Sequence, residues 1–226
     1  MTGGPLLAID TATTVAVVAL GDGSGALLAE EPWVAGYRHG EELLPRIRRI
    51  LDGTSVAMDA VAGIVVGTGP GAFTGLRVGI ATAKGLAHAL DRPIAGVSSG
   101  EALIAAAAGP DGDPGAIVLL LPAGPSDRVV VRHGQAARLL AGGSEPELAA
   151  DEVLVAVDLD GRAPDDAVAR GELARGGLAA ALVKLGAGRM QSGDVDDLAR
   201  LVPEYVTLPR GVRASTGEVA WSRDHR

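Results

Sequence analysis

The 226-residue chain contains no cysteine, and aromatic residues make up only 2% of its composition. Without cysteine it can form no disulfide, no thiol nucleophile and no cysteine-ligated metal site. The shortage of aromatic rings removes the stacking platforms on which single-stranded nucleic acids bind. The core must therefore be built from the aliphatic side chains that dominate the 47% hydrophobic content.

Positive charge and long apolar runs are scarce as well. Twenty Lys and Arg residues face 28 Asp and Glu residues, for a net charge of -8, which argues against a principal nucleic-acid binder. No Lys or Arg precedes Arg38, so the basic start of a secretory signal is not expected. No apolar run reaches the ~18 residues of a membrane-spanning helix. The composition predicts a soluble cytoplasmic protein without membrane contact.

Apolar runs separated by turn residues predict an α/β fold in which helices pack on mixed sheets. Two early runs joined by a glycine-rich turn suggest an antiparallel meander. The breaker cluster over residues 109–115 marks a boundary between two lobes. We expect an N-terminal lobe over 1–108, a smaller C-terminal lobe over 109–210 and a polar tail over 211–226. The expected strands cover residues 5–10, 14–20, 26–30, 61–66, 93–97, 116–121, 128–132 and 153–157, and the expected helices cover 41–51, 76–90, 101–108 and 173–185.

Residues 67–79 read Gly-Thr-Gly-Pro-Gly-Ala-Phe-Thr-Gly-Leu-Arg-Val-Gly and join a predicted strand to a predicted helix. A glycine-rich loop that leads into a helix N-terminus can cradle a phosphate. It lacks the Gly-Lys-Ser/Thr ending of a P-loop and the spacing of a dinucleotide fingerprint, so a tight connection without ligand is the alternative. Asp10 and Thr11 lie in an earlier turn, where turn hydrogen bonds are favoured over a metal–phosphate role. Together with Gly69 and Gly71 they form the candidate phosphate site.

No metal centre or catalytic residue is predicted. His39 would need a second histidine four residues later for a helical metal pair, and position 43 is Leu43. The acidic residues between Asp158 and Asp166 lack EF-hand spacing and are expected to form a solvated loop. Ser98 and Ser99 do not belong to a Gly-x-Ser-x-Gly elbow, which disfavours a serine hydrolase.

The predicted helix over 76–90 is apolar almost all round. Gly79, Ala83 and Ala87 form a row of small residues that would let another helix approach closely. Packing within the chain is one interpretation of this row. Because the lobe supplies few helices, contact with a helix of another chain is favoured.

Several segments resemble the TsaB family in order and spacing. They are residues 7–13, 39–45, 67–79, 84–87 and 96–98, and the sequence Pro203-Glu204-Tyr205 looks like the family's C-terminal Pro-x-Tyr element. The first hundred residues carry most of the resemblance. TsaB is the dimerization subunit of the bacterial tRNA threonylcarbamoyladenosine machinery. The resemblance implies an actin/Hsp70-like (ASKHA) two-lobe fold with a shortened, degenerate second lobe.

The resemblance also implies a non-catalytic subunit without a cofactor. Its partners would be the catalytic paralogue TsaD and the ATPase TsaE, with tRNA reached only through the complex and a homodimer formed when alone. Carried onto this chain, the implied partner interface on the first two helices consists of Leu43, Leu44, Ile47, Arg77, Gly79, Ile80, Ala83, Lys84 and Ala87.

Three features depart from related patterns. The His-x-x-x-His metal pair of the catalytic paralogue is broken at Leu43, and Ala12 alters the Asp-x-Gly phosphate turn of sugar kinases. The stretch over 122–130 differs from the corresponding family segment. The alternative function is an ATP-dependent phosphotransferase of the ASKHA type. A protease is disfavoured, because the sequence supplies neither a credible nucleophile nor a metal site.

Overall fold

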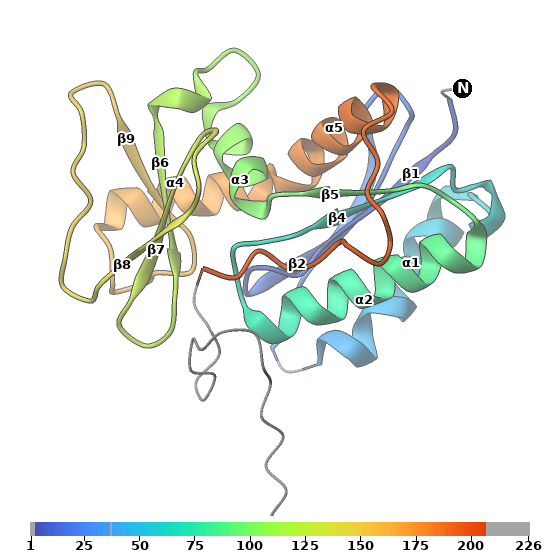
Figure 1. The fold of residues 1–226 in the computed structure, drawn as a ribbon, viewed down its shortest axis with the longest axis horizontal. Helices are drawn as coiled ribbons and strands as arrows, with labels where there is room; N and C mark the ends of the chain where they lie inside the picture. The colour runs from blue at the N-terminus through green and yellow to red at the C-terminus, as the bar shows by residue number, and fades with distance from the viewer. Residues whose placement is uncertain (1–2, 37, 207–226) are drawn as a thin grey trace, which may run out of the picture.

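The computed structural model describes residues 3–36 and 38–206, apart from the side chain of His39. Two mixed sheets form the framework (Figure 1). The first has the strand order β3-β2-β1-β4-β5 and the second the order β8-β7-β6-β9. This architecture confirms the predicted α/β class with helices packed on mixed sheets. None of the helices in the described ranges is long and apolar enough to cross a membrane.

The first sheet contains the predicted antiparallel meander, extended by two parallel strands. The strands β1, β2 and β3 pair antiparallel, whereas β4 runs parallel to β1 and β5 parallel to β4. The connections from β1 to β4 and from β4 to β5 each contain a helix, because two parallel strands cannot be joined by a tight turn and need a longer crossover. The bounds are β1 Leu6–Asp10, β2 Val15–Gly21, β3 Leu27–Val34, α1 His39–Thr54, β4 Gly63–Gly67, α2 Phe73–Leu90 and β5 Ile94–Val97.

Both faces of the first sheet are covered. Helices α1 and α2 lie on one face, and α5 (Leu178–Gln191) lies on the other (Figure 1). Along β1, Leu7 and Ile9 belong to the core cluster under α1 and α2, while Ala8 belongs to the cluster under α5. Side chains alternate between faces along a strand, so a strand buried on both sides reads as one apolar run.

The second sheet is smaller and only partly predicted. Its strands are β6 Ile117–Pro122, β7 Arg128–Arg132, β8 Arg138–Leu140 and β9 Val153–Ala156, with α3 Ser99–Ala108 and α4 Asp165–Gly176 beside them. The edge strand β8 was missed because it has no apolar run and its side chains are exposed or half-buried. The single helix predicted over 173–185 is wrong, since Gly177 separates α4 from α5.

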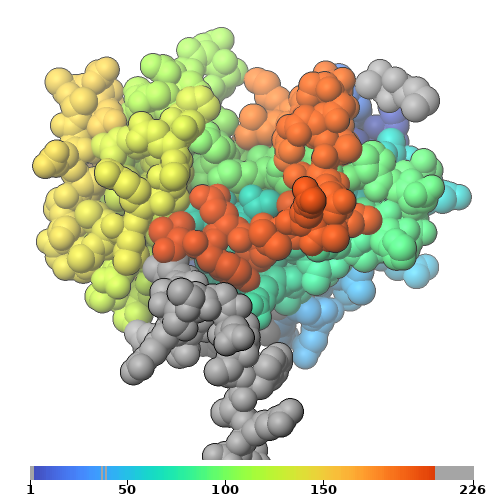
Figure 2. All heavy atoms as spheres, in the orientation of Figure 1, coloured from blue at the N-terminus to red at the C-terminus, as the bar shows by residue number. Residues whose placement is uncertain are grey.

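The end of the described chain returns to the first lobe. The backbone N–H of Asp196 donates to the carbonyl of Ile94, and its carboxylate accepts from the N–H of Gly96. These bonds cover the outer edge of β5, which would otherwise offer unpaired groups to another strand. Residues 192–206 then cross the front face towards the second lobe (Figure 2).

The predicted boundary at 108/109 separates the strands of the two sheets, whereas α5, Asp196 and Leu201 contact the first sheet or its core. The division into domains at that boundary stays a prediction. The predicted polar tail lies outside the described residues.

Two glycines of α5 provide a matched test of its packing. A Cβ at Gly186 would lie 2.4 Å from Cγ2 of the buried Val65 on β4, whereas a Cβ at Gly188 would meet nothing within 4 Å. We expect Gly186→Ala to lower the free energy of unfolding by about 1–3 kcal/mol through overpacking. Gly188→Ala should raise it by up to about 1 kcal/mol, because alanine favours a helix. Urea unfolding measures both, and equal effects would contradict the packing of α5 on β4.

Candidate functional site: the interlobe cleft and the α1/α2 face

The glycine-rich loop is fitted around the turn that follows β1. A Cβ at Gly71 would lie 2.3 Å from the carbonyl oxygen of Ala12, and a Cβ at Gly79 would lie 2.2 Å from Oγ1 of Thr11. The backbone N–H of Ala72 donates to that Ala12 carbonyl at 2.7 Å. The glycines are therefore needed because another part of the same chain occupies the space beside them.

Asp10 is enclosed at the centre of this arrangement. Its side chain is fully buried, with Oδ1 accepting from the N–H of Ala12 at 2.8 Å and Oδ2 accepting from Oγ of Ser99 at 2.6 Å. A Cβ at Gly67 would lie 1.9 Å from Oδ2. Burial raises the pKa of Asp10, and the bonds from Ser99 and Ala12 oppose that rise.

The other predicted phosphate-site residues are also engaged within the chain. Thr11 is buried and donates from Oγ1 to the carbonyl of Gly75. Gly69 is buried, and its N–H donates to Ser99 Oγ. Gly71 alone among the four predicted residues lines the cleft described below. The structure brings the four together, yet it directs Asp10 and Thr11 into the protein.

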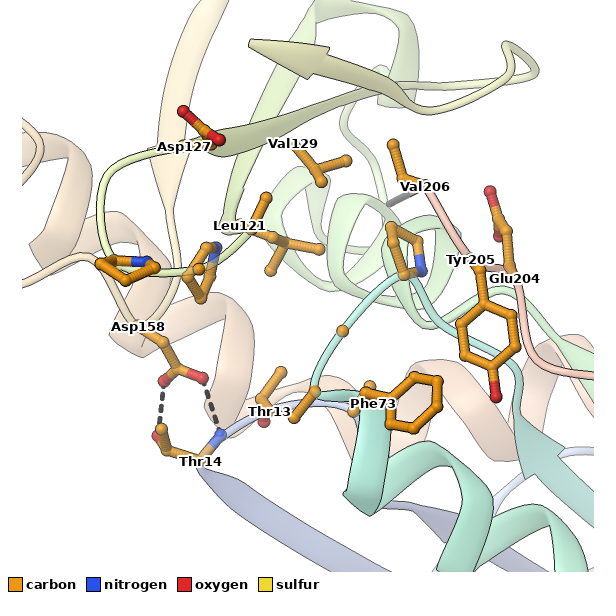
Figure 3. Close-up of a pocket in the computed structure, with 18 of the residues that line it drawn as sticks. Thr13, Thr14, Phe73, Leu121, Asp127, Val129, Asp158, Glu204, Tyr205 and Val206 are labelled. Carbon is orange, nitrogen blue, oxygen red and sulfur yellow. Dashed lines mark hydrogen bonds between the residues drawn. The ribbon is translucent and has the colours of Figure 1, made fainter. Parts of the chain in front are cut away.

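A cleft of about 750 Å³ lies where the two lobes meet. Thr13 and Phe73 line the first-lobe side, Leu121 and Val129 the second-lobe side, and Tyr205 one end (Figure 3). The divergent stretch over 122–130 supplies much of the second-lobe wall, including residues 122–127.

Asp158 joins the two lobes across this cleft. Its carboxylate accepts from the backbone N–H of Thr14 at 2.7 Å and from Thr14 Oγ1 at 2.6 Å (Figure 3). It also accepts from Arg175 at 2.8 Å. Its side chain is only 6% exposed. The prediction of a solvated loop is therefore wrong at this residue, because only the tertiary structure places Thr14 opposite it.

The charges of the cleft are unfavourable to a nucleotide. The described lining residues include the carboxylates of Asp127, Asp158 and Glu204 and no Lys, Arg or His. Burial, with Glu101 adding repulsion, raises the pKa of Glu204. Polyphosphates need cationic donors or a metal ion. Among the side chains that the structure describes in residues 3–36 and 38–206, which do not include that of His39, no group of three or more acidic or histidine side chains could hold such an ion.

The predicted interface residues divide into two groups. Leu44 is 54% exposed, Arg77 is exposed, and Lys84 is half-buried with Nζ bonded to the carbonyl of Leu201. The side chains or positions of the remaining six are buried within this chain, namely Leu43, Ile47, Gly79, Ile80, Ala83 and Ala87. Five of these six residues belong to the core cluster between the two helices and the first sheet, and Gly79 packs against Thr11. The assignment of the nine residues to a partner interface stays a prediction.

A different row of α2 faces outward. Thr74, Arg77, Ala81, Gly85 and His88 are exposed on it. A Cβ at Gly85 would meet nothing within 4 Å, so no described residue requires a glycine there. The small size of Ala81 and Gly85 could have indicated this exposed row from the sequence. The row of Gly79, Ala83 and Ala87 consists of equally small residues, so the two rows could not be told apart.

The family model described as "TsaD: tRNA N6-adenosine threonylcarbamoyltransferase" matches residues 31–185, more than half of the chain. Two solved Pseudomonas aeruginosa structures, titled as YeaZ and as a protein similar to peptidase YEAZ, superimpose with TM-scores of 0.66 and 0.68 at 27% and 26% identity. They cover 91% and 92% of this chain and 100% of their own chains.

The chain belongs to the TsaB/YeaZ family. Among curated relatives, the TsaB proteins of Bacillus subtilis and Escherichia coli are 37% and 38% identical over 106 and 95 residues. These alignments cover 44% and 42% of this chain. The matched part spans only 43% and 40% of those relatives' own length. Both are named tRNA threonylcarbamoyladenosine biosynthesis proteins.

The enclosed carboxyl of this TsaB-family chain should give stability a distinctive pH dependence. The folded-state pKa of Asp10 is raised above 3.8. Its neutral form is therefore favoured in the native state, and stability is lost as pH rises through the raised pKa. Asp10→Asn keeps the shape without the charge. The free energy of unfolding of this variant relative to the parent should increase with pH by up to about 1.4 kcal/mol per pH unit.

Urea unfolding at several pH values above about pH 4 measures this difference. Asp22→Asn is the control, because hydrogen bonds from Ser24 and Ala26 lower the pKa of Asp22. The stabilising contribution of Asp22 is complete above the ordinary aspartate pKa of 3.8 and is lost only as pH falls below it, so the difference between Asp22→Asn and the parent should stay constant over this pH range. Parallel pH profiles for Asp10→Asn and the parent would contradict the enclosed state of Asp10.

Proposed function

We propose that this chain is the non-catalytic partner subunit of a bacterial tRNA threonylcarbamoyltransferase complex. It binds the catalytic paralogue TsaD, acts together with the ATPase TsaE and supports threonylcarbamoyl transfer to the adenosine beside the tRNA anticodon. It works in the cytoplasm, meets tRNA through the complex and pairs with a second copy when the partner is absent. Membership of the TsaB/YeaZ family supports this function.

The observation that carries the non-catalytic role is the position of Leu43. In the metal-binding pattern of the paralogue, the residue four after the first histidine is a second ligand. Here that residue is a leucine only 1% exposed, packed in the core under α1 and α2. Position 43 therefore lacks a metal-binding side chain, and it is also buried in the core, where a metal ligand could not reach an ion at the surface.

The outward face of α1 and α2 is the surface that we assign to the partner. The two helices pack side by side on one face of the first sheet. Leu44 projects from α1 with 54% of its surface exposed, and Ala81 and Gly85 are exposed on α2. Small residues allow a partner helix to approach closely, and an exposed leucine gives it an apolar contact.

Substitutions on this face should prevent assembly without unfolding the subunit. We expect Leu44→Glu and Gly85→Arg each to weaken the complex with TsaD at least about thirtyfold, the size of an interface hot spot. Neither substitution disturbs a buried contact in the free chain. Light scattering behind size exclusion, with titration calorimetry, measures assembly and affinity.

Leu173→Glu is the matched control, because Leu173 is 79% exposed on α4 of the other lobe. It should leave the affinity unchanged. Full assembly of both Leu44→Glu and Gly85→Arg would contradict the assigned surface. Failure of the unmodified chain to bind TsaD would contradict the partner-subunit function itself.

The phosphotransferase alternative is tested by nucleotide binding. Among the described residues, the acidic cleft and the enclosed Asp10 offer no cationic group that could bind the phosphates of a nucleoside triphosphate. Calorimetry of the isolated chain with ATP and magnesium should show only heat of dilution. A saturable heat that disappears in Ser126→Trp, a bulky change at an exposed position of the cleft wall, would restore the alternative.

A further inference from the structure

The chain has one phenylalanine and two tyrosines, and two of these three residues meet around one arginine. The guanidinium carbon of Arg77 lies 4.0 Å from the ring centre of Phe73, and Nε donates to the hydroxyl of Tyr205 at 2.9 Å. The two rings lie 5.1 Å apart between centres, and they stand together at the edge of the cleft (Figure 3). The residues come from α2 and from the far end of the described chain.

These contacts fix the direction of an exposed arginine. Contact with the ring of Phe73 restrains the guanidinium of Arg77, and the hydrogen bond to Tyr205 uses its Nε–H donor. Within residues 3–36 and 38–206, its two Nη groups make no hydrogen bond or ion pair. An arginine held in this way has already lost much side-chain freedom, so it loses less on binding.

The surroundings select an anion for those Nη donors. Helix α2 contains Arg77, Lys84 and His88 and no Asp or Glu over its 18 residues, although the whole chain is acidic. Lys84 is engaged with the Leu201 carbonyl. The parallel Nη donors of an arginine match the two oxygens of a carboxylate, and they remain charged at all physiological pH values.

We propose that Arg77, held by Phe73 and Tyr205, receives an Asp or Glu carboxylate of the partner subunit. The binding surface then extends from α2 onto residues 203–206, so the end of the described chain shapes the interface as well as covering the first sheet. This inference rests on the proposed function, because it names the chemistry of the partner at that surface. Tyrosine and arginine are also enriched at interface hot spots.

A protein carboxylate fits better than an RNA phosphate. Nucleic-acid binding draws on several cations that neutralise successive phosphates, and the chain carries a net charge of -8. A single arginine held by two aromatic rings is suited to an ion pair with one carboxylate. The partner should therefore present a single acidic side chain opposite the N-terminal part of α2.

The test measures the affinity of the full chain for TsaD by calorimetry. Arg77→Met should weaken binding about thirtyfold or more, as expected when one member of an interface ion pair is removed. Arg77→Lys should recover only part of that loss, since lysine keeps the charge without the planar fork. Tyr205→Phe should give an intermediate loss because it frees Nε. Arg138→Met, an exposed arginine of β8, is the control and should change nothing.

Two further measurements separate this role from a purely structural one. The thermal midpoints of the free Arg77 and Tyr205 variants should match the parent, while the salt dependence of binding should flatten for Arg77→Met. Arg77→Glu should abolish binding, and replacing one acidic residue of TsaD by arginine should restore it.

Binding of Arg77→Met and Arg77→Glu at parental affinity would overturn the inference while the partner-subunit function stands. A complex whose subunit affinity is unchanged, but whose tRNA affinity falls with Arg77→Met, would also overturn it and point to a phosphate. If Leu44→Glu and Gly85→Arg block assembly while the Arg77 variants do not, the partner surface includes Leu44 and Gly85 without reaching Arg77, and the inference is overturned.

Discussion

The close approach of the turn after β1 to the glycine-rich segment organises the first lobe. Ala12, Thr11 and Asp10 occupy the spaces that Cβ atoms would fill at Gly71, Gly79 and Gly67. No other residue type leaves that room, so the loop between β4 and α2 follows the shape of the turn. The position of α2, and with it the outward row of Ala81 and Gly85, depends on this contact.

The same contact fills the space beside a segment that resembles a phosphate loop. A phosphate cradle needs its N–H groups and its carboxylate open to a ligand. In this chain Asp10 turns inward to Ser99 and Ala12, and the cleft beside it is lined by carboxylates and apolar side chains. The strand β4, the glycine-rich loop and helix α2 follow one another as in a phosphate cradle, while the side chains of Asp10 and Thr11 are enclosed within the chain.

Residues from the C-terminal part of the described chain also pack against the first lobe. Asp196 satisfies the edge of β5, and Tyr205 meets Phe73 and Arg77 at the start of α2. Asp158 holds the second lobe to Thr14. Each of these contacts joins segments that are far apart in the sequence, so the cleft and the α1/α2 face are not properties of the first hundred residues alone.

The sequence by itself determined the main strands and helices of the first lobe and the family, whereas the division of the chain near residue 109 stays a prediction. Apolar periodicity and glycine-rich turns are local signals, and they were sufficient for β1, β4 and α2. They could not tell the buried row of Gly79 and Ala83 from the exposed pair of Ala81 and Gly85, because both sets are small and uncharged. The tertiary structure decided which row meets the sheet, since only the fitted turn at Thr11 shows where the space beside a glycine is already filled.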